Sequence, residues 1–210
     1  KKMHNLQKDL AGRIQKISKY GIMPFLGMMV GFDHDDKTVF EEINQFISQT
    51  HSPIAGISLL NAPRHTPLYQ RLQQDRRLIG DDFTGEWQLS TNIIPKQMSR
   101  DDLFDGYCQL FKKIYDPDAF YERFAGWLCR VDYFCDLYTK KNFDPNQLLN
   151  GMRLLFYFLV LAKPAERGLF IKSMRKTWEI NPRLLRRTFT FLAQYHHFSE
   201  FVKNKLPSHL

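Results

Sequence analysis

The stretch GIMPFLGMMVGFDHDDKTVFEEINQFISQTHSPIAGISLLNAPRHTPLYQR, residues Gly21–Arg71, decides the fold. Met23–Val30 and Ile54–Leu60 are apolar runs, and between them Thr38 and Glu41 have the spacing of a capping box at a helix start. Neither run alternates apolar with polar residues, which predicts strands covered on both faces, as in a parallel sheet wrapped by helices. The stretch therefore predicts a right-handed strand–helix–strand unit.

Two short motifs in this stretch carry a family resemblance. Gly27-Met28-Met29-Val30-Gly31 resembles the GxIxG strand motif of radical S-adenosylmethionine (SAM) barrels, and Leu59-Leu60-Asn61 resembles the end of the next strand of such a barrel. The resemblance implies that the side chains at these strand ends position the nucleoside of SAM. The cofactor-binding residues it implies are Met29, Val30, Gly31, Leu59 and Asn61.

A longer ordered pattern is similar to the cobalamin-binding branch of that superfamily. It comprises Asn5, Asp9-Leu10, Ile14, Ile17, Gly21-Ile22, Val30-Gly31-Phe32-Asp33, Asp35, Phe40, Phe46-Ile47, Ala62, Thr66-Pro67-Leu68-Tyr69 and Arg71-Leu72. The chain departs from the pattern at Arg64-His65, where a turn containing glycine is usual, and at His34, where the wider superfamily often has Glu. Arg64 and His65 are the substrate-side candidates, with a plain surface turn as the equal alternative.

The resemblance implies an α/β fold followed by an all-α fold. The α/β part is the last portion of a partial TIM-like (β/α)6 barrel, and a C-terminal helical bundle follows it. The expected domains are residues 1–78 (barrel), 79–98 (ordered connecting loop) and 99–210 (helical domain). A protein of this class would cleave SAM to a 5′-deoxyadenosyl radical and modify or methylate an unactivated carbon. Its partners would be an upstream barrel and cobalamin domain of the same chain and a small-molecule or lipid substrate.

The cysteines do not supply a cluster loop. A radical SAM protein holds a [4Fe–4S] cluster through CxxxCxxC, whereas Cys108, Cys129 and Cys135 lack that spacing and are interpreted as structural. A DxHxxG cobalamin motif is also missing, and the chain opens KKMHNLQKDL without a start methionine. The sequence therefore predicts a piece of a longer enzyme, inactive by itself, with no catalytic residue and no metal site of its own.

Helix signals dominate the rest of the chain. Leu6, Leu10, Ile14 and Ile17 predict a helix over Asn5–Tyr20 that packs its apolar stripe on the sheet. Ser99 is the expected N-cap of another helix, and four more helices are expected to begin at the prolines of Asp116-Pro117, Asp144-Pro145, Lys163-Pro164 and Asn181-Pro182. Leu154–Ala162 is apolar all round, which predicts the central helix of the bundle; nine residues are too few for a bilayer, which needs about twenty.

The remaining polar clusters have structural interpretations. Acidic residues ahead of a helix, here Asp33, Asp35 and Asp36 beside His34, stabilise its start, although a base or metal site is the alternative. Asp132 and Asp136 lie one turn apart, but Asp136 also has the spacing of an ion pair with Lys140. The adjacent His196 and His197 point about 100° apart, a poor arrangement for a chelate.

The net charge of +8 comes from 30 Lys and Arg against 22 Asp and Glu, and it is concentrated late in the chain. Residues 147–210 carry eleven Lys or Arg and three Glu, densest at Arg175, Lys176, Arg183, Arg186 and Arg187. A solvated helix face is the first interpretation and an anionic membrane the second; no nucleic-acid motif accompanies the charge. Three scattered cysteines favour a reducing compartment, so the expected location is the cytoplasm. A peripheral position on the inner membrane face is the second expectation, based on the basic residues.

The rival hypothesis is a non-catalytic helical module that docks a protein partner or an anionic membrane. The barrel hypothesis makes one structural prediction that the rival does not require. Two strands and one crossover helix cannot close a barrel, so Met23–Val30 should have an unpaired edge while residues 99–210 form their own core.

Overall fold

The computed structural model describes residues 9–79, 90–133 and 145–206 of the 210-residue chain. The chain forms two compact units, each built from separate segments. The sheet unit comprises Phe25–Ile47, Ala55–Ile114 and Glu200–Leu210, and the helical unit comprises Lys1–Pro24, Ser48–Ile54 and Tyr115–Ser199.

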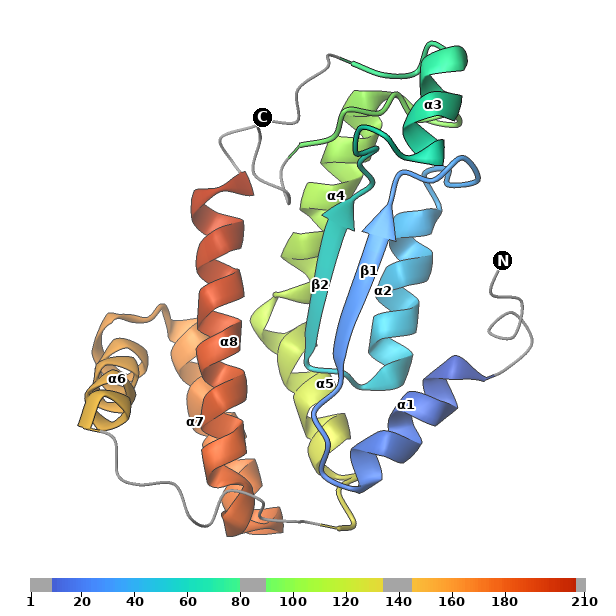
Figure 1. Ribbon diagram of the computed structural model, residues 1–210. Coiled ribbons are helices and arrows are strands. Elements are labelled where there is room, and N and C mark those ends of the chain that lie inside the picture. The colour runs from blue at the N-terminus through green and yellow to red at the C-terminus, as the bar shows by residue number, and fades with distance from the viewer. Residues whose placement is uncertain (1–8, 80–89, 134–144, 207–210) are drawn as a thin grey trace. The chain divides into compact units, whose positions relative to one another are not determined.

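The sheet unit is organised around a strand–helix–strand motif. Strand β1 (Phe25–Val30) leads through helix α2 (Val39–Thr50) to strand β2 (Ile54–Leu59). The two strands run in the same direction (Figure 1) and form a two-stranded sheet, and the Leu60 amide extends the pairing by donating to the Val30 carbonyl at 2.8 Å. The predicted unit is therefore confirmed. Among the described strands each has one unpaired edge, and the rest of the predicted barrel stays a prediction.

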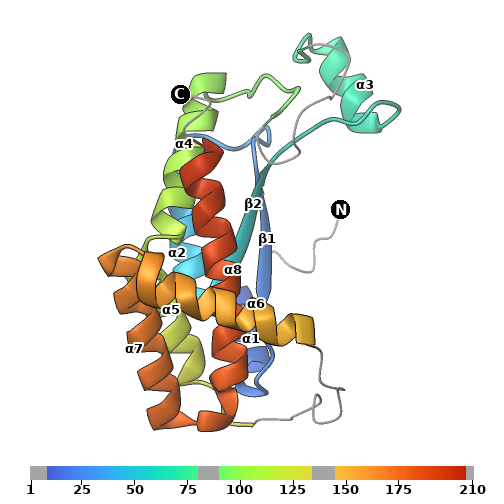
Figure 2. The same ribbon diagram turned by 90° about the vertical axis from the view of Figure 1, so that its left-hand side faces the viewer.

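Among the described residues, helices cover only one face of this sheet. Helices α2 and α4 (Arg100–Ile114) both lie on the same side of the strands, as Figures 1 and 2 show from two directions. Along β1, Leu26 and Val30 are buried, whereas Phe25 and Met29 on the other face are 60% and 43% exposed. The prediction that both faces are covered is wrong for the described residues. Burial alternates along β1 although polarity does not.

Helix α4 begins at a side-chain N-cap and packs on the covered face through a buried stripe. The Asp102 amide donates to the Ser99 hydroxyl at 3.0 Å, and the Ser99 amide donates back to the Asp102 carboxylate at 3.3 Å, which confirms the predicted N-cap. The Tyr107 hydroxyl reaches the Ile57 carbonyl of β2 at 3.4 Å. The buried stripe consists of Leu103, Tyr107, Cys108, Leu110, Phe111 and Ile114.

Helix α3 (Pro67–Gln74) stands beyond the carboxyl ends of the strands (Figure 1). Thr66 caps it by accepting a hydrogen bond from the Tyr69 amide at 3.2 Å, with Pro67 in the first turn. Leu72, the buried residue of α3, packs with Ala62 and Ile93 in a small cluster. The predicted connecting loop over residues 79–98 falls partly on residues 80–89, which lie outside the described ranges.

Four helices of the helical unit begin at proline, as predicted: α5 (Pro117–Leu128), α6 (Pro145–Phe156), α7 (Pro164–Ile180) and the 3-10 helix η3 (Pro182–Leu184). The unit also contains α1 (Leu10–Lys19), the π-helix η2 (Tyr157–Leu161) and most of α8 (Leu185–Asn204). The side chains of Asp116 and Asn181 cap α5 and η3, whereas Lys163 makes no side-chain cap. Asp144 lies outside the described residues.

Aromatic side chains of α5 and α8 form the centre of this unit. Trp127 meets Phe191 edge-on with ring centroids 4.9 Å apart, and Phe120 lies 4.8 Å from Tyr195; all four are buried. The prediction that Leu154–Ala162 is the central helix is wrong. That segment is the end of α6 followed by η2, and only one of its sides is buried.

Helix α1 also differs from expectation in its packing. It is capped by Asp9, whose carboxylate accepts from the Gly12 amide at 2.8 Å, and it ends before Gly21, whose φ of +68° suits the predicted C-terminal glycine. Leu10 and Ile17 are exposed, so the predicted burial of its apolar stripe is wrong. The predicted first turns, residues 5–8, lie outside the described residues.

Candidate functional site

The open face of the sheet is the first component of the candidate site. β1 contributes Phe25, Gly27 and Met29, and β2 contributes Gly56 and Ser58, because alternate residues of a strand share a face. The ring of Phe25 lies against Gly56, where an added Cβ would meet the ring at 3.0 Å. Phe25 therefore covers the amino-terminal end of this face, and Met29 lies near the carboxyl end.

Gly27 leaves a space that no described atom fills. A Cβ built on Gly27 meets nothing within 4 Å, and its φ does not lie in the left-handed region. Glycine is unfavourable in a strand unless a turn, a bulge or a close neighbour requires it. Nothing in the described chain requires glycine here, so the residue leaves room on the open face for a group that approaches from outside it.

A tight turn closes the end of β1. Gly31 has a φ of +105°, which favours glycine, and its amide donates to the Asp35 carboxylate at 2.8 Å. The same carboxylate oxygen accepts from the Phe32 amide at 2.9 Å. Asp36 accepts from the amide and hydroxyl of Thr38 at 2.7 and 2.6 Å at the start of α2. These bonds support the structural interpretation of the acidic cluster for Asp35 and Asp36.

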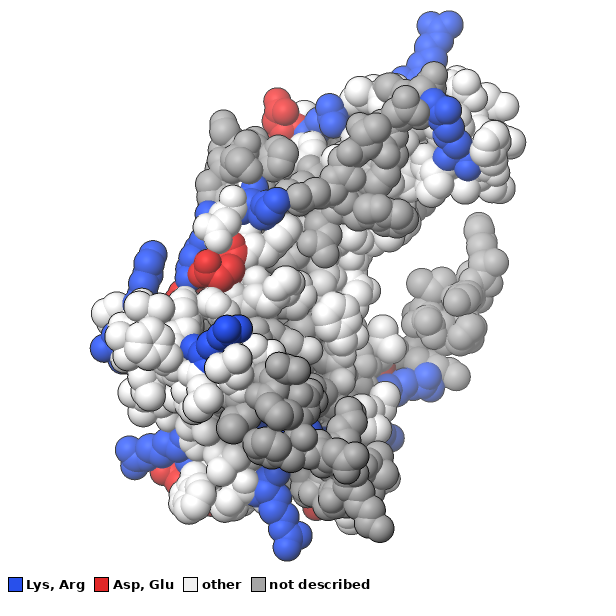
Figure 3. Space-filling model, turned by 60° about the vertical axis from the view of Figure 1, so that its left-hand side comes forward, with Lys and Arg blue, Asp and Glu red and all other residues white. Residues whose placement is uncertain are grey.

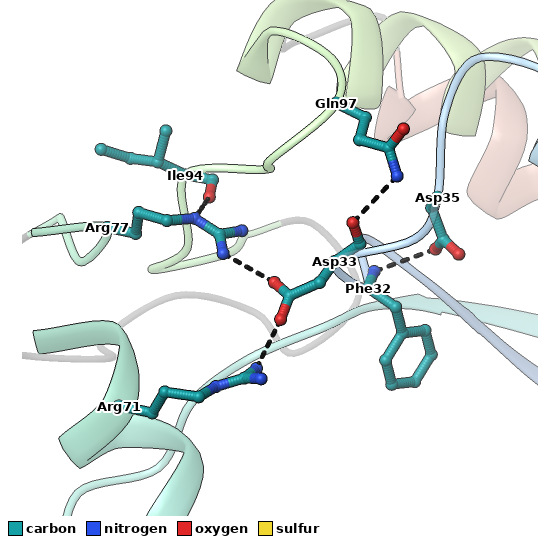
Figure 4. A network of polar contacts seen from close by, with 7 residues as sticks. All are labelled: Phe32, Asp33, Asp35, Arg71, Arg77, Ile94 and Gln97. Carbon is teal, nitrogen blue, oxygen red and sulfur yellow. Dashed lines mark hydrogen bonds and ion pairs between the residues drawn. The ribbon is translucent and has the colours of Figure 1, made fainter. Parts of the chain in front are cut away.

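Asp33 joins this turn to two arginines (Figure 4). Its carboxylate accepts from Arg77 Nη1 at 2.6 Å and pairs with Arg71 Nη2 at 2.7 Å, while its backbone carbonyl accepts from Gln97 Nε2 at 3.0 Å. Arg77 Nε also donates to the Ile94 carbonyl at 2.9 Å. The hydrogen bond from Arg77 holds the pKa of Asp33 below its ordinary value; partial burial opposes this, and the charges of Arg77 and Arg71 add to it.

This Asp33 latch, the carboxylate with Arg71 and Arg77, holds α3 and the segment after it at the carboxyl end of β1. Sequence reasoning missed it. The partners lie 38 and 44 residues from Asp33, and no local pattern distinguishes these two arginines from neighbouring Arg76. The latch leaves Asp33 fully engaged as a structural anion.

A pair of asparagines fixes the end of β2. Asn61 donates its amide to the carbonyls of Leu59 and Ser90 at 3.2 and 3.0 Å, and its side-chain oxygen accepts from the Asn92 amide at 3.1 Å. Asn92 in turn bonds both the amide and the carbonyl of Ala62 at 2.9 Å. Both amide hydrogens of Asn61 are thus used, so a ligand there would meet only its carbonyl oxygen.

The five residues assigned to the nucleoside are placed differently from one another. Met29 lies on the open face, and Gly31 and Asn61 lie in the turns at the strand ends. Val30 and Leu59 are on the covered face and fully buried at 0% and 2% exposure, so only their backbone could reach a ligand on the open face. The assignment of all five to a nucleoside stays a prediction.

Arg64 and His65 occupy the exposed turn between β2 and α3. His65 has a φ of +66°, and the Thr66 hydroxyl and amide close the turn on the Pro63 carbonyl at 2.7 and 3.3 Å. Both residues follow the end of β2 and precede the start of α3. Their substrate-side role stays a prediction.

The other candidate groups do not form a metal site. Among the described residues no three His, Cys, Asp or Glu come together. Cys108 is buried, which raises the pKa of its thiol, and Cys129 is exposed; Cys135 and Asp136 lie outside the described ranges. Asp132 instead pairs with Lys19 at 3.6 Å, and His196 packs 4.0 Å from the Tyr157 ring. These residues do not fit a [4Fe–4S] cluster or cobalamin.

The structure thus defines an α/β unit with an open sheet face and a helical unit. The chain belongs to the family described as a domain of unknown function, DUF4070, whose match covers residues 66–208. An uncharacterized methyltransferase of Synechocystis sp. is 32% identical over 125 residues, which are 59% of this chain and 23% of that protein. A hopanoid C-2 methylase of Rhodopseudomonas palustris is 40% identical over 81 residues, 39% of this chain and 15% of that protein.

The chain therefore spans less than a quarter of the length of these curated relatives. No solved structure matches it.

Proposed function

We propose that this chain is the closing part of a radical SAM barrel, with its helical extension, in an enzyme that methylates an unactivated carbon. The two relatives whose names state an activity are a methyltransferase and a methylase, which supports this class of reaction. The substrate class we propose is a small molecule or lipid. The enzyme would use SAM, with the cluster and cobalamin held by parts of the protein outside this chain.

The observation that carries the proposal is the one-sided sheet with its vacant space at Gly27. In a (β/α) barrel, helices cover the outer face of each strand and the inner face lines the site, which lies at the carboxyl ends of the strands. β1 and β2 have helices on one face only, and the other face presents Gly27 and Met29. Closed by further strands, this face would become the inner wall of a barrel.

The chain's own residues would shape the wall for a nucleoside. Gly27 would leave space for a flat ring, Met29 would make an apolar contact with it, and the Gly31–Asp35 turn would hold the end of β1 in place. Asn61 would offer the second lone pair of its side-chain oxygen, which already accepts from the Asn92 amide. When bound and reduced, SAM supplies a carbon radical able to abstract hydrogen from an unactivated carbon.

The test compares two glycines that both have open space. In the full-length protein reconstituted with iron and sulfide, Gly27→Ala and then Gly27→Val should lower SAM affinity in a graded way, measured by equilibrium binding. Gly168→Ala on α7, where a Cβ also meets nothing within 4 Å, is the matched control and should leave affinity unchanged. Unchanged SAM affinity in Gly27→Val, or failure of the reconstituted wild type to form 5′-deoxyadenosine, would overturn the proposal.

A further inference from the structure

The segment formed by α6 and η2 exposes a continuous apolar side. We call this side the α6 strip. Its residues are between 38% and 65% exposed, and they recur every three or four positions, as expected for one side of a helix. The strip consists of Leu149, Met152, Leu155, Phe156, Leu159, Val160 and Leu161.

The opposite side of the same segment is already fixed to the helical unit. The Tyr157 hydroxyl donates to the Glu166 carboxylate at 2.9 Å, and the Tyr157 ring lies 4.0 Å from His196. Phe158 stacks on Phe170 with ring centroids 5.0 Å apart. Because this side anchors the segment to α7 and α8, the strip is left facing outward. A helix that is apolar all round belongs in a core or in lipid.

Backbone carbonyls at the end of the segment are hydrogen-bonded to a side chain, as they would need to be where water is scarce. Arg167 Nη2 donates to the carbonyls of Val160 and Ala162 at 3.2 and 3.4 Å, next to the most exposed residue of the strip, Leu161. A helix end normally leaves such carbonyls to solvent, and their removal from water is costly unless they are paired. Arg167 therefore satisfies these groups where the strip ends.

Charge around the strip indicates what covers it. Arg153 on α6 and Lys163 just after η2 are both exposed. Residues 145–199 contain nine Lys or Arg and two Glu; one of these, Glu166, is buried against Tyr157, and the other, Glu179, is paired with Arg175 at 2.9 Å. Figure 3 shows Lys and Arg side chains scattered among uncharged residues on this side, with a small acidic patch beside them. Exposed cations next to an apolar strip complement an anionic lipid surface.

We propose that the α6 strip inserts into the interfacial layer of an anionic bilayer, with Arg153 and Lys163 near the headgroup phosphates. The segment would lie in the plane of the membrane, with its apolar side buried by about 5–10 Å. Among the described helices none is both long and apolar enough to cross a bilayer. The inference does not depend on the SAM chemistry, although a lipid substrate would be reached from this position.

Flotation of the full-length protein with liposomes tests the proposal. The wild type should float with vesicles of phosphatidylcholine containing phosphatidylglycerol at low salt, and it should be released as ionic strength rises. Phe156→Ser with Leu161→Ser should reduce binding at least tenfold. Ile22→Ser, an equally exposed apolar residue elsewhere in the helical unit, is the matched control and should bind as the wild type does.

Charge variants separate the two contributions. Arg153→Gln with Lys163→Gln should weaken binding to anionic vesicles by about fivefold for each cation removed and leave any binding to phosphatidylcholine alone unchanged. Equal wild-type binding to neutral and anionic vesicles would overturn the anionic preference. No flotation, or a dimer in sedimentation that Leu161→Ser dissociates, would overturn the membrane assignment, and SAM cleavage measured in parallel would show whether the proposed function fails with it.

Discussion

Phe25 and Gly56 face each other across the two strands of the sheet, and the Phe25 ring occupies the position that a side chain at residue 56 would need. Gly56→Val should therefore lower the free energy of unfolding by less than about 1 kcal/mol, because the ring must shift by a few tenths of an ångström and, at 60% exposure, has room to do so. Gly27→Val, on the neighbouring strand with no such obstacle, should be neutral or stabilising by about 0.5 kcal/mol. Denaturant unfolding of the two variants measures the difference.

Truncation of the ring provides the control for this pair. Phe25→Ala removes the obstacle, so Phe25→Ala with Gly56→Val should be less destabilised than the sum of the two single changes. Strict additivity of the two free-energy changes would contradict the assignment of Gly56 to the Phe25 contact.

The two arginines of the Asp33 latch should contribute unequally to stability. Arg77 is 14% exposed and also holds the Ile94 carbonyl, whereas Arg71 is 54% exposed and screened by solvent. Arg77→Gln should therefore cost about 1–2 kcal/mol of unfolding free energy and Arg71→Gln less than about 0.5 kcal/mol. Equal losses in urea titrations of the two variants would show that exposure does not discriminate between them.

The Asp33 latch should also make the stability of the fold depend on pH in acid. The pKa of Asp33 is lowered in the folded state, chiefly by the hydrogen bond from Arg77. The ionised carboxylate therefore stabilises the fold at pH values above the pKa of Asp33 in the unfolded chain. This stabilisation is lost as the pH falls through the pKa of Asp33 in the folded chain. Asp33→Asn should reduce stability at neutral pH and flatten its decline below about pH 4. Thermal unfolding of both proteins from pH 7 to pH 3 checks this; parallel curves would exclude Asp33 as a source of acid sensitivity.

His51 should make the helical unit less stable in mild acid. Burial lowers its pKa, and the charges of Arg130 and Arg123 add to this, so below about pH 6.5 the unfolded chain binds the proton more readily than the folded chain. Stability should therefore fall as pH drops from 7 to 5, and His51→Asn should reduce that fall. Asn suits the φ of 55° at this position, and His65→Asn, at a φ of 66°, controls for Asn in such a backbone.

Arg123 is a buried tie between α5 and the segment before β2. It donates to the carbonyls of Ser52, Pro53 and Ala119 at 3.1, 3.4 and 3.0 Å, and burial lowers its pKa to about 10, so it stays charged at neutral pH. Arg123→Leu should cost about 3 kcal/mol because these carbonyls lose their donors. Arg123→Lys should not restore the loss, since an ammonium lacks the forked geometry. Full recovery of the melting temperature in Arg123→Lys would contradict this role.

Local sequence signals predicted where helices and strands form. They could not predict which side chains are buried, because burial depends on packing between distant segments. Pro117 and Pro164 mark helix starts because proline suits the first turn and no other, which is a property of the residue itself. Burial is not such a property. Leu154–Ala162 has the composition of a core helix, but only its Tyr157 and Phe158 side packs against other helices, while Leu161 is exposed. The Asp33 latch escaped prediction because nothing near Asp33 in the sequence specifies its partners.

The interleaving of the two units limits how this chain can be divided. The polypeptide passes from one unit to the other five times, after Pro24, Ile47, Ile54, Ile114 and Ser199. No single cut in the gene can release either unit whole, and the stretch matched by the family, residues 66–208, leaves both strands behind. Recombination that moved only that stretch between proteins would separate α4 from the sheet it covers. We therefore expect the strands and the later helices to be inherited together.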